Sequence, residues 1–412
     1  MRRVAVTGLG VIAPLGNSVN ELFVNLAAGR SGVRRLAAPL AERLKSPIGA
    51  TADFDGSTHF PAPRLRMLDR VSQLALVATA QAIADSRIDF AGERRERCGV
   101  SVGTAMGGAE STDEGYQTIY ALRSDRVKPY SVLTAMSNAA ASWIGIDYEL
   151  CGPNLTYSTA CSSSAVAIGE AARRIGYGDV DVMLAGGAEA PLTFGVLRAW
   201  EAMRTLAAED PQDPSSSCRP FASTRTGLVL GEGAAFVVLE EWSHAVARGA
   251  QIRAELSGYG LTTDIAHITR PTVEGQASAM RAAMNAAGVE PDAIDYVNAH
   301  GTGTLQNDAV ETAALKEILG ARAYGVPVSS TKSMHGHLLG AAGALEFVIA
   351  VASLERGIVP PTMHLDSPDP ACDLDYVAGR ARAGVPLRTV MSNSFAFGGT
   401  NAVLIAARGV PR

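Results

Sequence analysis

The sequence has 412 residues, of which 47% are hydrophobic and 19% charged, and its formal net charge is −5 at neutral pH. This composition is typical of a soluble globular protein with a large core. The sequence contains no run of lysine or arginine, which would be the sign of a nucleic-acid partner. The cysteines at 98, 151, 161, 218 and 372 lack C-x-x-C spacing. That pattern argues against a disulfide scaffold or a zinc site and favours a reducing cytoplasm.

The first predicted element is a buried strand and turn within residues 1–16. Two arginines precede its apolar run, as in a signal peptide, but glycines and Pro14 interrupt the run and no cleavage site closes it. Residues 8–13 match the dinucleotide fingerprint G-x-G-x-x-A. Pro14 and Gly16 would break the helix that this motif needs, and no acidic residue follows at the required distance. We therefore interpret Gly8 and Gly10 as a tight turn after a strand.

Strands and helices then alternate, which predicts an α/β protein. Residues 71–85 have helical apolar spacing, and residues 98–108 predict a strand that ends in a glycine loop. A small-residue helix at 162–176 leads into the apolar stretch 179–187, and another at 275–288 leads into 293–301. This echo is weak evidence for an internal duplication, and it predicts a second chemical element at His300.

Two later segments need an interpretation. Residues 207–227 are rich in proline, serine and charge, and they predict a long surface loop before a buried strand at 231–241. Residues 338–354 are almost long enough to span a bilayer, but Glu346 lies at their centre, where a charge is costly. We expect a buried helix there and no membrane association.

Cys161 lies where a predicted strand at 155–159 meets the helix that follows it. At a helix N-terminus, free N–H groups and the helix dipole favour a thiolate. The same N–H groups can hold an oxyanion when a thioester or ester is attacked. From this stretch alone, a small buried packing cysteine is an equal alternative.

Two histidine motifs favour the chemical interpretation. His300 stands in "NAHGTGT" at the end of a predicted strand, and His337 stands in "STKSMHGHLLGAAGALE", five residues after Lys332. Either histidine alone is more often structural. Together with Cys161 they would supply a nucleophile and two imidazoles that can donate hydrogen bonds to a developing negative charge.

These motifs, together with "TACSSS" at Cys161 and "NSFAFGGTNAVL" at 393–404, resemble the β-ketoacyl-acyl carrier protein synthases of the condensing-enzyme family. The resemblance runs in order along essentially the whole chain. It implies a thiolase-like fold, a five-layered α-β-α-β-α structure built from two duplicated halves. Residues 1–250 would carry the cysteine and residues 251–412 the two histidines. It also implies a dimer.

The resemblance implies an elongating type II ketosynthase, which is an acyltransferase of fatty acid or polyketide and polyene synthesis. Cys161 would take an acyl group from the phosphopantetheine arm of an acyl carrier protein, with backbone N–H groups of Cys161 and Phe397 as the oxyanion hole. Malonyl carrier protein would then lose carbon dioxide, and His300 and His337 would stabilise the enolate. No tightly bound cofactor or metal is implied. Met106 matches a position that lines the acyl pocket, although ordinary packing is an alternative.

Other residues match supporting positions of the family. Lys332 and Glu346 would form a buried ion pair that orients the site. Thr302 and Thr304 match positions that bind the pantetheine, although a plain turn role is an alternative. Asp308 matches a structural acid in the same loop.

Three positions depart from the family pattern. Ala396 stands where glycine is usual, which puts gating by Phe397 in doubt because alanine restricts the backbone. His335 replaces a commoner threonine, so a metal pair with His337 is a weak alternative. Leu305 replaces a proline. From these departures we form the hypothesis that the protein belongs to a specialised polyketide or polyene branch of the family.

Other protein classes fit the sequence less well than this interpretation. A thiolase acting on coenzyme A esters would need a second cysteine near the C-terminal glycine motif, which contains none. An initiating synthase would carry asparagine in place of one histidine. Chain-length-factor subunits resemble this chain but lack the cysteine, so Cys161 indicates the active half. The sequence is compatible both with a homodimer and with a heterodimer that contains such a subunit.

Overall fold

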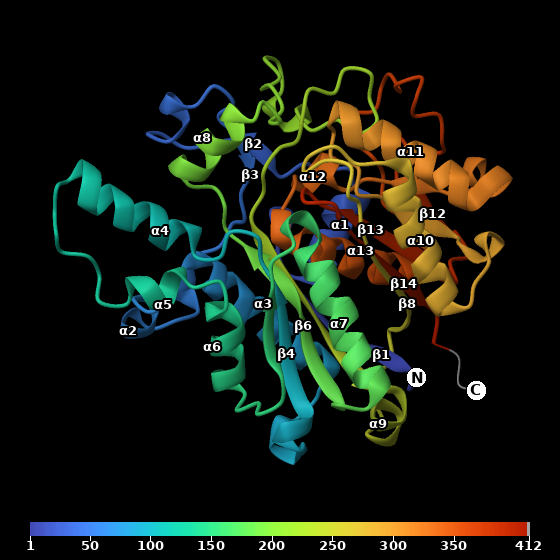
Figure 1. Cartoon of the computed structure of the whole chain (residues 1–412), viewed down its shortest axis with the longest axis horizontal. Helices are drawn as coiled ribbons and strands as arrows, with labels where there is room; N and C mark the ends of the chain where they lie inside the picture. The colour runs from blue at the N-terminus through green and yellow to red at the C-terminus, as the bar shows by residue number, and fades with distance from the viewer. Residues whose placement is uncertain (410–412) are drawn as a thin grey trace.

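The computed structural model describes residues 1–409, and its centre is a mixed sheet of ten strands (Figure 1). The strand order is β10-β9-β13-β14-β8-β1-β7-β6-β4-β5. The strands from the first part of the chain are β1 (Val4–Ile12), β4 (Cys98–Gly103), β5 (Asn154–Tyr157), β6 (Val182–Glu189) and β7 (Gly233–Glu241). Those from the second part are β8 (Ala254–Thr263), β9 (Tyr296–Asn298), β10 (Val328–Ser329), β13 (Thr389–Phe395) and β14 (Thr400–Ala407).

The two sets of strands have the same topology. From the outer edge inward, the order is β5, β4, β6, β7 and β1 in the first set and β10, β9, β13, β14 and β8 in the second. In each set, therefore, the third strand along the chain is at the edge, followed by the second, fourth, fifth and first. The sets meet at β1 and β8, which pair only through Ala5 with Glu255 and Val6 with Ala254. The division at residues 250 and 251 falls between β7 and β8. It stays a prediction, and the repeated strand order supports it.

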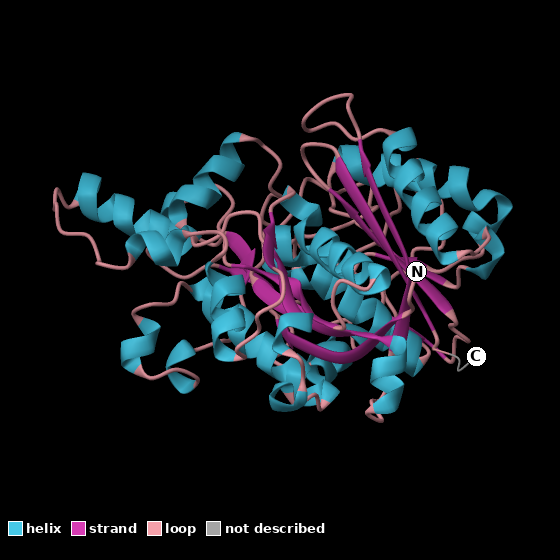
Figure 2. Ribbon diagram, turned by 60° about the horizontal axis from the view of Figure 1, so that its bottom comes forward, coloured by secondary structure: helices cyan, strands magenta, loops and turns pink. Residues whose placement is uncertain are grey.

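Helices cover both faces of each half-sheet and give the five-layered α-β-α-β-α arrangement of the thiolase-like fold (Figure 2). α3 (Arg70–Ser86) and α6 (Ala139–Asp147) cover the outer face of the first half. α10 (Val273–Ala287) and α11 (Leu305–Leu319) cover that of the second half. α7 (Ser163–Tyr177) and α13 (Ala342–Arg356) form the middle layer.

Shorter elements complete the structure. The helices are α1 (Val19–Ala27), α2 (Ala62–Leu65), α4 (Ala109–Tyr116), α5 (Ser131–Ala135), α8 (Phe194–Ala202), α9 (Trp242–Ala247) and α12 (Lys332–His335). Two ribbons pair β2 (Val33–Arg35) with β3 (Ile48–Ala50) and β11 (Ile358–Val359) with β12 (Arg382–Ala383). α4 and α5 extend away from the body of the molecule (Figure 1).

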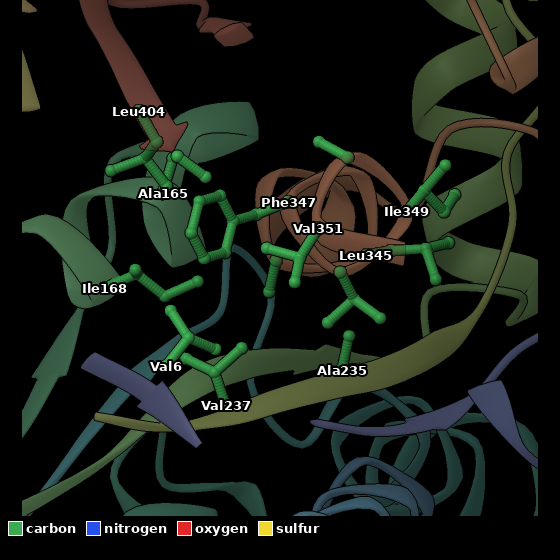
Figure 3. Close-up of a cluster of buried hydrophobic side chains, with 14 of the residues drawn as sticks. Val6, Ala165, Ile168, Ala235, Val237, Leu345, Phe347, Ile349, Val351 and Leu404 are labelled. Atoms are coloured by element: carbon green, nitrogen blue, oxygen red, sulfur yellow. The ribbon is translucent and has the colours of Figure 1, made fainter. Parts of the chain in front are cut away.

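The middle layer contains the largest part of the hydrophobic core. In Figure 3, Phe347 and Val351 of α13 lie among Ala165 and Ile168 of α7 and Val237 of β7. Every residue of α13 from Ala342 to Leu354 is buried, as expected for the apolar stretch around Glu346. No helix within residues 1–409 is long and apolar enough to cross a membrane.

The predicted turn at Gly8 and Gly10 is wrong, because β1 continues through both glycines. A Cβ atom at Gly8 would overlap the carbonyl oxygen of Ala82, and one at Gly10 would overlap that of Ala78. The glycines therefore let α3 pack directly against the strand, and the chain turns only after Ile12.

The segment 207–227 is only partly the surface loop that its composition predicts. Its first half is largely accessible, but Cys218, Phe221 and Arg225 are buried. Phe221 stacks on Tyr376 with ring centroids 3.9 Å apart, and its N–H donates to Asp308 at 2.8 Å. Buried partners from the second half of the chain thus draw a polar segment into the interior.

Candidate active site

Cys161 lies at the predicted strand-to-helix junction. β5 ends at Tyr157, a single 3-10 turn spans Ala160–Ser162, and α7 begins at Ser163. Ala160 has a left-handed backbone with φ of 51°, which is unusual for alanine and gives the chain a sharp turn immediately before the cysteine. Cys161 itself is 6% exposed and packs in a cluster with Leu228, Leu230 and Leu339.

Burial opposes the thiolate that the helix position of Cys161 favours. Burial raises the pKa of Cys161 to about 12, and the Glu189 and Glu346 carboxylates add to the increase. Lys332 and a hydrogen bond from the Phe397 N–H act in the opposite direction but do not overcome desolvation. The Phe397 N–H is therefore directed at the sulfur, as expected for one oxyanion-hole donor.

His300 and His337 come together beside Cys161. One ligand atom from each of the three residues lies within 4.8 Å of the others. The imidazole centroids are 5.3 Å apart, and the rings are nearly perpendicular at 83°. Burial lowers the pKa of both histidines well below the ordinary value, and the Lys332 cation lowers it further. Both imidazoles are therefore neutral at physiological pH.

The hydrogen bonds of the two histidines indicate which nitrogen carries the proton. The Leu339 N–H donates to Nδ1 of His337 at 3.2 Å, so the proton of that ring lies on Nε2. Lys332 Nζ lies 3.5 Å from Nδ1 of His300, which favours the same tautomer there. Nε2 of His337 is buried and has no hydrogen-bond partner within residues 1–409. The site thus holds a free N–H donor directed into the space around Cys161.

Lys332 and Glu346 form the predicted ion pair, and both are 0% exposed. Lys332 also donates to the carbonyl oxygen of His300 at 2.6 Å, so one ammonium group fixes the backbone and faces the ring of that histidine. Burial raises the pKa of Glu346 to about 7, against the opposing effect of Lys332. The Lys332 ammonium of this pair adds to the effect of burial in lowering the pKa of both histidines.

Two carboxylates of α11 hold the loop that follows His300. Asp308 accepts from the N–H groups of Thr302 at 3.0 Å and Gly303 at 3.2 Å, which fits the structural role expected for it. Glu311 accepts from the N–H groups of His300 and Gly301, both at 2.8 Å. Glu311 was not predicted from the sequence. Its spacing of three residues from Asp308, on one face of a helix beside the glycine loop, is a signal that could have found it.

A pocket of about 360 Å³ opens onto Cys161, His300 and His337. Thr302, Thr304, Leu305, Ala396 and Phe397 also line it. The Phe397 ring stacks on Trp200, a residue not predicted from the sequence, with centroids 5.9 Å apart. Thr304 accepts from the Asn307 N–H at 3.3 Å and caps α11, so the turn role exists whether or not the residue binds pantetheine.

Met106 does not line this pocket. Its side chain is 41% exposed, and its backbone N–H donates to Glu189 at 3.0 Å. An acyl-pocket role for Met106 thus stays a prediction, and the gating role of Phe397 also stays a prediction.

Cys161, His300 and His337 could alternatively bind a metal ion. Among residues 1–409, they form the group whose ligand atoms have suitable spacing. The neighbouring Lys332 cation and the Nε2 protons oppose a metal ion there. His335 cannot complete a metal pair with His337. Its Nδ1 bonds to the Gly336 carbonyl oxygen at 2.8 Å and its Nε2 to the Thr331 hydroxyl at 2.9 Å, so both nitrogens are occupied.

Comparison with known proteins gives a consistent result. Residues 1–245 match the β-ketoacyl synthase N-terminal domain, and residues 253–366 match the β-ketoacyl synthase C-terminal domain. The chain is 42% identical over 403 residues to nodulation protein E of Rhizobium meliloti strain 1021, covering 98% of each chain. It is 41% identical over 410 residues to 3-oxoacyl-[acyl-carrier-protein] synthase 2 of Coxiella burnetii, covering 99% of each.

A solved structure is similarly close. The ishigamide ketosynthase/chain length factor matches with a TM-score of 0.92 and 33% identity, covering 99% of this chain and all of the other.

Proposed function

The chain belongs to the β-ketoacyl synthase family, and from that membership we infer that it elongates an acyl chain by decarboxylative condensation with a malonyl thioester. The observation that carries this inference is the grouping of Cys161, His300 and His337 within 4.8 Å at the end of a pocket. A nucleophilic thiol and two neutral imidazoles that donate hydrogen bonds are what such a condensation requires.

The first half-reaction loads the acyl group onto Cys161. The sulfur attacks the carbonyl carbon of an acyl thioester, the C–S bond to the carrier breaks, and the proton of Cys161 ends on the departing thiol. During attack the carbonyl oxygen becomes an oxyanion, and we assign the backbone N–H groups of Cys161 and Phe397 to hold it. The Phe397 N–H that is directed at the sulfur supports this assignment.

The second half-reaction makes the carbon–carbon bond. The malonyl thioester loses carbon dioxide, and the electron pair left behind forms an enolate whose oxygen accepts hydrogen bonds from Nε2 of His300 and His337. The carbanion attacks the acyl carbonyl, the bond to Cys161 breaks, and the sulfur regains a proton. No base has to remove a proton from the malonyl group, so neutral imidazoles fit the step. The reaction also requires no resident cofactor.

We propose that an acyl carrier protein delivers both substrates on its phosphopantetheine arm, as the name of the Coxiella relative indicates for that enzyme. Arg204 and Arg270 line the pocket, where positive charge would suit an acidic carrier, and Thr302 and Thr304 line the same pocket as Cys161. We also propose a reducing, cytoplasmic setting, because all five cysteines are unpaired.

Two alternatives differ in their support. A thiolase acting on coenzyme A esters is disfavoured, because Cys161 is the one cysteine among the described residues that line the pocket. A dimer with a chain-length-factor subunit is a second candidate beside a homodimer, since the ishigamide structure is named as such a pair. The specialised polyketide or polyene branch stays a hypothesis.

Intact-mass spectrometry with a panel of acyl carrier protein thioesters tests the function. We expect the wild type to gain the acyl mass and, after addition of malonyl carrier protein, to release a product two carbons longer. Cys161→Ala should gain no mass with any thioester. Acylation of the alanine variant would show that Cys161 is not the nucleophile. Acylation of the wild type only after a co-purified subunit is added would favour the heterodimer.

A further inference from the structure

Glu189, the last residue of β6, is a fully buried carboxylate close to the reaction centre, and the mechanism above does not use it. Its side chain is 0% exposed, and no lysine, arginine or histidine within residues 1–409 forms an ion pair with it. A buried carboxylate without a counterion is costly, so its retention needs another explanation.

Four hydrogen-bond donors surround Glu189. Oε1 accepts from the Thr104 hydroxyl and the Met106 N–H, both at 3.0 Å, and Oε2 accepts from the N–H groups of Ala105 at 2.6 Å and Gly340 at 2.9 Å. Three of these donors are backbone N–H groups, which favour an ionised carboxylate. Burial acts in the opposite direction and raises the pKa of Glu189 to about 7.

The bond to Gly340 connects Glu189 with His337. Gly340 lies in the 3-10 turn Leu339–Ala341, directly after the histidine segment. Leu339 in the same turn has φ of 45°, a costly conformation for leucine, and its N–H holds Nδ1 of His337. A Cβ atom at Gly340 would overlap the Ala105 nitrogen and Oε2 of Glu189, so the turn packs directly on the carboxylate. The position of the imidazole thus depends on a strained turn that Glu189 holds.

The structure also places Glu189 within electrostatic reach of the nucleophile. Its charge raises the pKa of Cys161, against the effect of Lys332. One carboxylate therefore contacts the His337 turn through a hydrogen bond and acts on Cys161 through its charge.

We propose that Glu189 is a positioning residue that fixes the Leu339–Ala341 turn and thereby aims Nε2 of His337 at the malonyl-derived enolate, without touching substrate itself. This inference rests on the roles proposed above for Cys161 and His337. It assigns Glu189 to the decarboxylation half-reaction, because acyl transfer to Cys161 does not require His337.

The experiment measures the two half-reactions separately in Glu189→Gln. The amide keeps the size of the side chain but presents an NH₂ group to donors that need an acceptor. We expect decarboxylation of malonyl carrier protein to fall about 10- to 100-fold, as for a misplaced catalytic group. Acylation of Cys161, followed by intact mass, should be retained or become faster.

Alkylation of Cys161 by iodoacetamide gives a readout that a purely structural role would not change. Removal of the Glu189 charge should shift the midpoint of the alkylation pH profile to lower pH and raise the rate at pH 7 several-fold. The profile is measured in a Cys151→Ser background, because Cys151 is exposed.

Glu240→Gln is the matched control. Glu240 is also 0% exposed, but it lies opposite Val182 at the start of β6, whereas Glu189 ends that strand. We expect this variant to lose stability and to leave the half-reaction ratio and the alkylation profile unchanged. If Glu189→Gln does not fold, Glu189→Asp replaces it. Aspartate keeps the charge but is one methylene too short for Gly340, so decarboxylation should fall while the alkylation midpoint stays in place.

An equal loss of both half-reactions, or an alkylation profile that matches the Glu240 control, would overturn the proposal. Failure of the proposed function has a different signature, because the wild type itself would then neither acylate nor decarboxylate. The alkylation measurement does not depend on that function.

Discussion

Two clusters of this protein, one fully buried and one partly exposed, combine a histidine, a glutamate and a cation, yet they hold their histidines in opposite charge states. In the active site, burial lowers the pKa of His300, and the cation of Lys332, which lies between Glu346 and the imidazole, lowers it further. In the second cluster, the two nitrogens of His244 face Glu240 at 2.9 Å and Glu93 at 3.0 Å. The pKa of His244 rises to about 9, mainly through the hydrogen bond to Glu240.

The difference shows that burial and the charge that faces the ring, and not the set of residue types, determine the charge of a histidine. In the second cluster, Arg248 binds the same Glu240 carboxylate, and Thr7 of β1 also contacts it. These contacts join β1, β7 and α9 far from the pocket residues. We expect the first arrangement to serve chemistry by keeping imidazoles neutral, and the second to serve stability by keeping an imidazole charged.

The largest expected effect comes from removing one histidine of each cluster. His337→Ala should lower the condensation rate about 10²- to 10⁴-fold, because the enolate loses a donor, and should leave acylation of Cys161 within a few-fold. His244→Ala should retain the wild-type condensation rate and lower the melting temperature. Single-turnover assays and thermal unfolding measure both. If His337→Ala and His244→Ala lowered the condensation rate to a similar extent, the assignment of His337 to chemistry and of His244 to stability would be wrong.

Removing the cation of each cluster should give a smaller effect on rate. Lys332→Ala should lower condensation about 10- to 100-fold and introduce a histidine inflection into its pH profile, since the pKa of each active-site imidazole rises without the cation. Arg248→Ala should keep its rate and lose about 1.5–3 kcal/mol of unfolding free energy, because Glu240 loses one of its two cationic partners. Urea titration measures the stability loss. An Arg248→Ala protein as stable as the wild type would contradict this account.

The smallest effect is a pH dependence that separates stability from activity. The folded pKa of His244 lies above its ordinary value of 6.5, so its stabilising effect is fully present below that pH and is lost as the pH rises through about 9. His244 is a quarter exposed, so solvent screening reduces the loss to about 1–2 kcal/mol. Urea titrations at pH 6 and pH 9.5 should show this difference, and His244→Gln should abolish it. The condensation rate should show no histidine inflection in that range.

Sequence motifs predicted most of the central residues of the site because these residues stand at or near the end of an element, next to glycines or hydroxyl side chains, whereas Glu346 was found as a charge inside an apolar stretch. Cys161, His300, His337, Lys332 and Glu346 all lie where the motifs suggested. The repeated helix-to-strand pattern likewise indicated the α/β organisation. These features are local, so a single sequence can show them.

The features that the sequence did not predict depend on long-range contacts. Glu189 meets Thr104 and Gly340, which are 85 and 151 residues away along the chain. A thiolate at Cys161 was predicted from a local helix dipole, but burial by distant segments opposes it. Gly8 and Gly10 were interpreted as a turn because nothing nearby in the sequence shows that α3 packs on them.

The position of α13 between the two half-sheets affects how the protein is made in the cell. α13 belongs to the second half of the chain, but it packs against α7 and β7 of the first half. A nascent chain that has reached β7 therefore presents an apolar face that stays uncovered until residues 342–356 leave the ribosome. Such a face is a substrate for chaperones and a cause of aggregation. The first half should consequently be insoluble when expressed alone and be rescued by co-expression of the second, although each half contains a complete set of five strands.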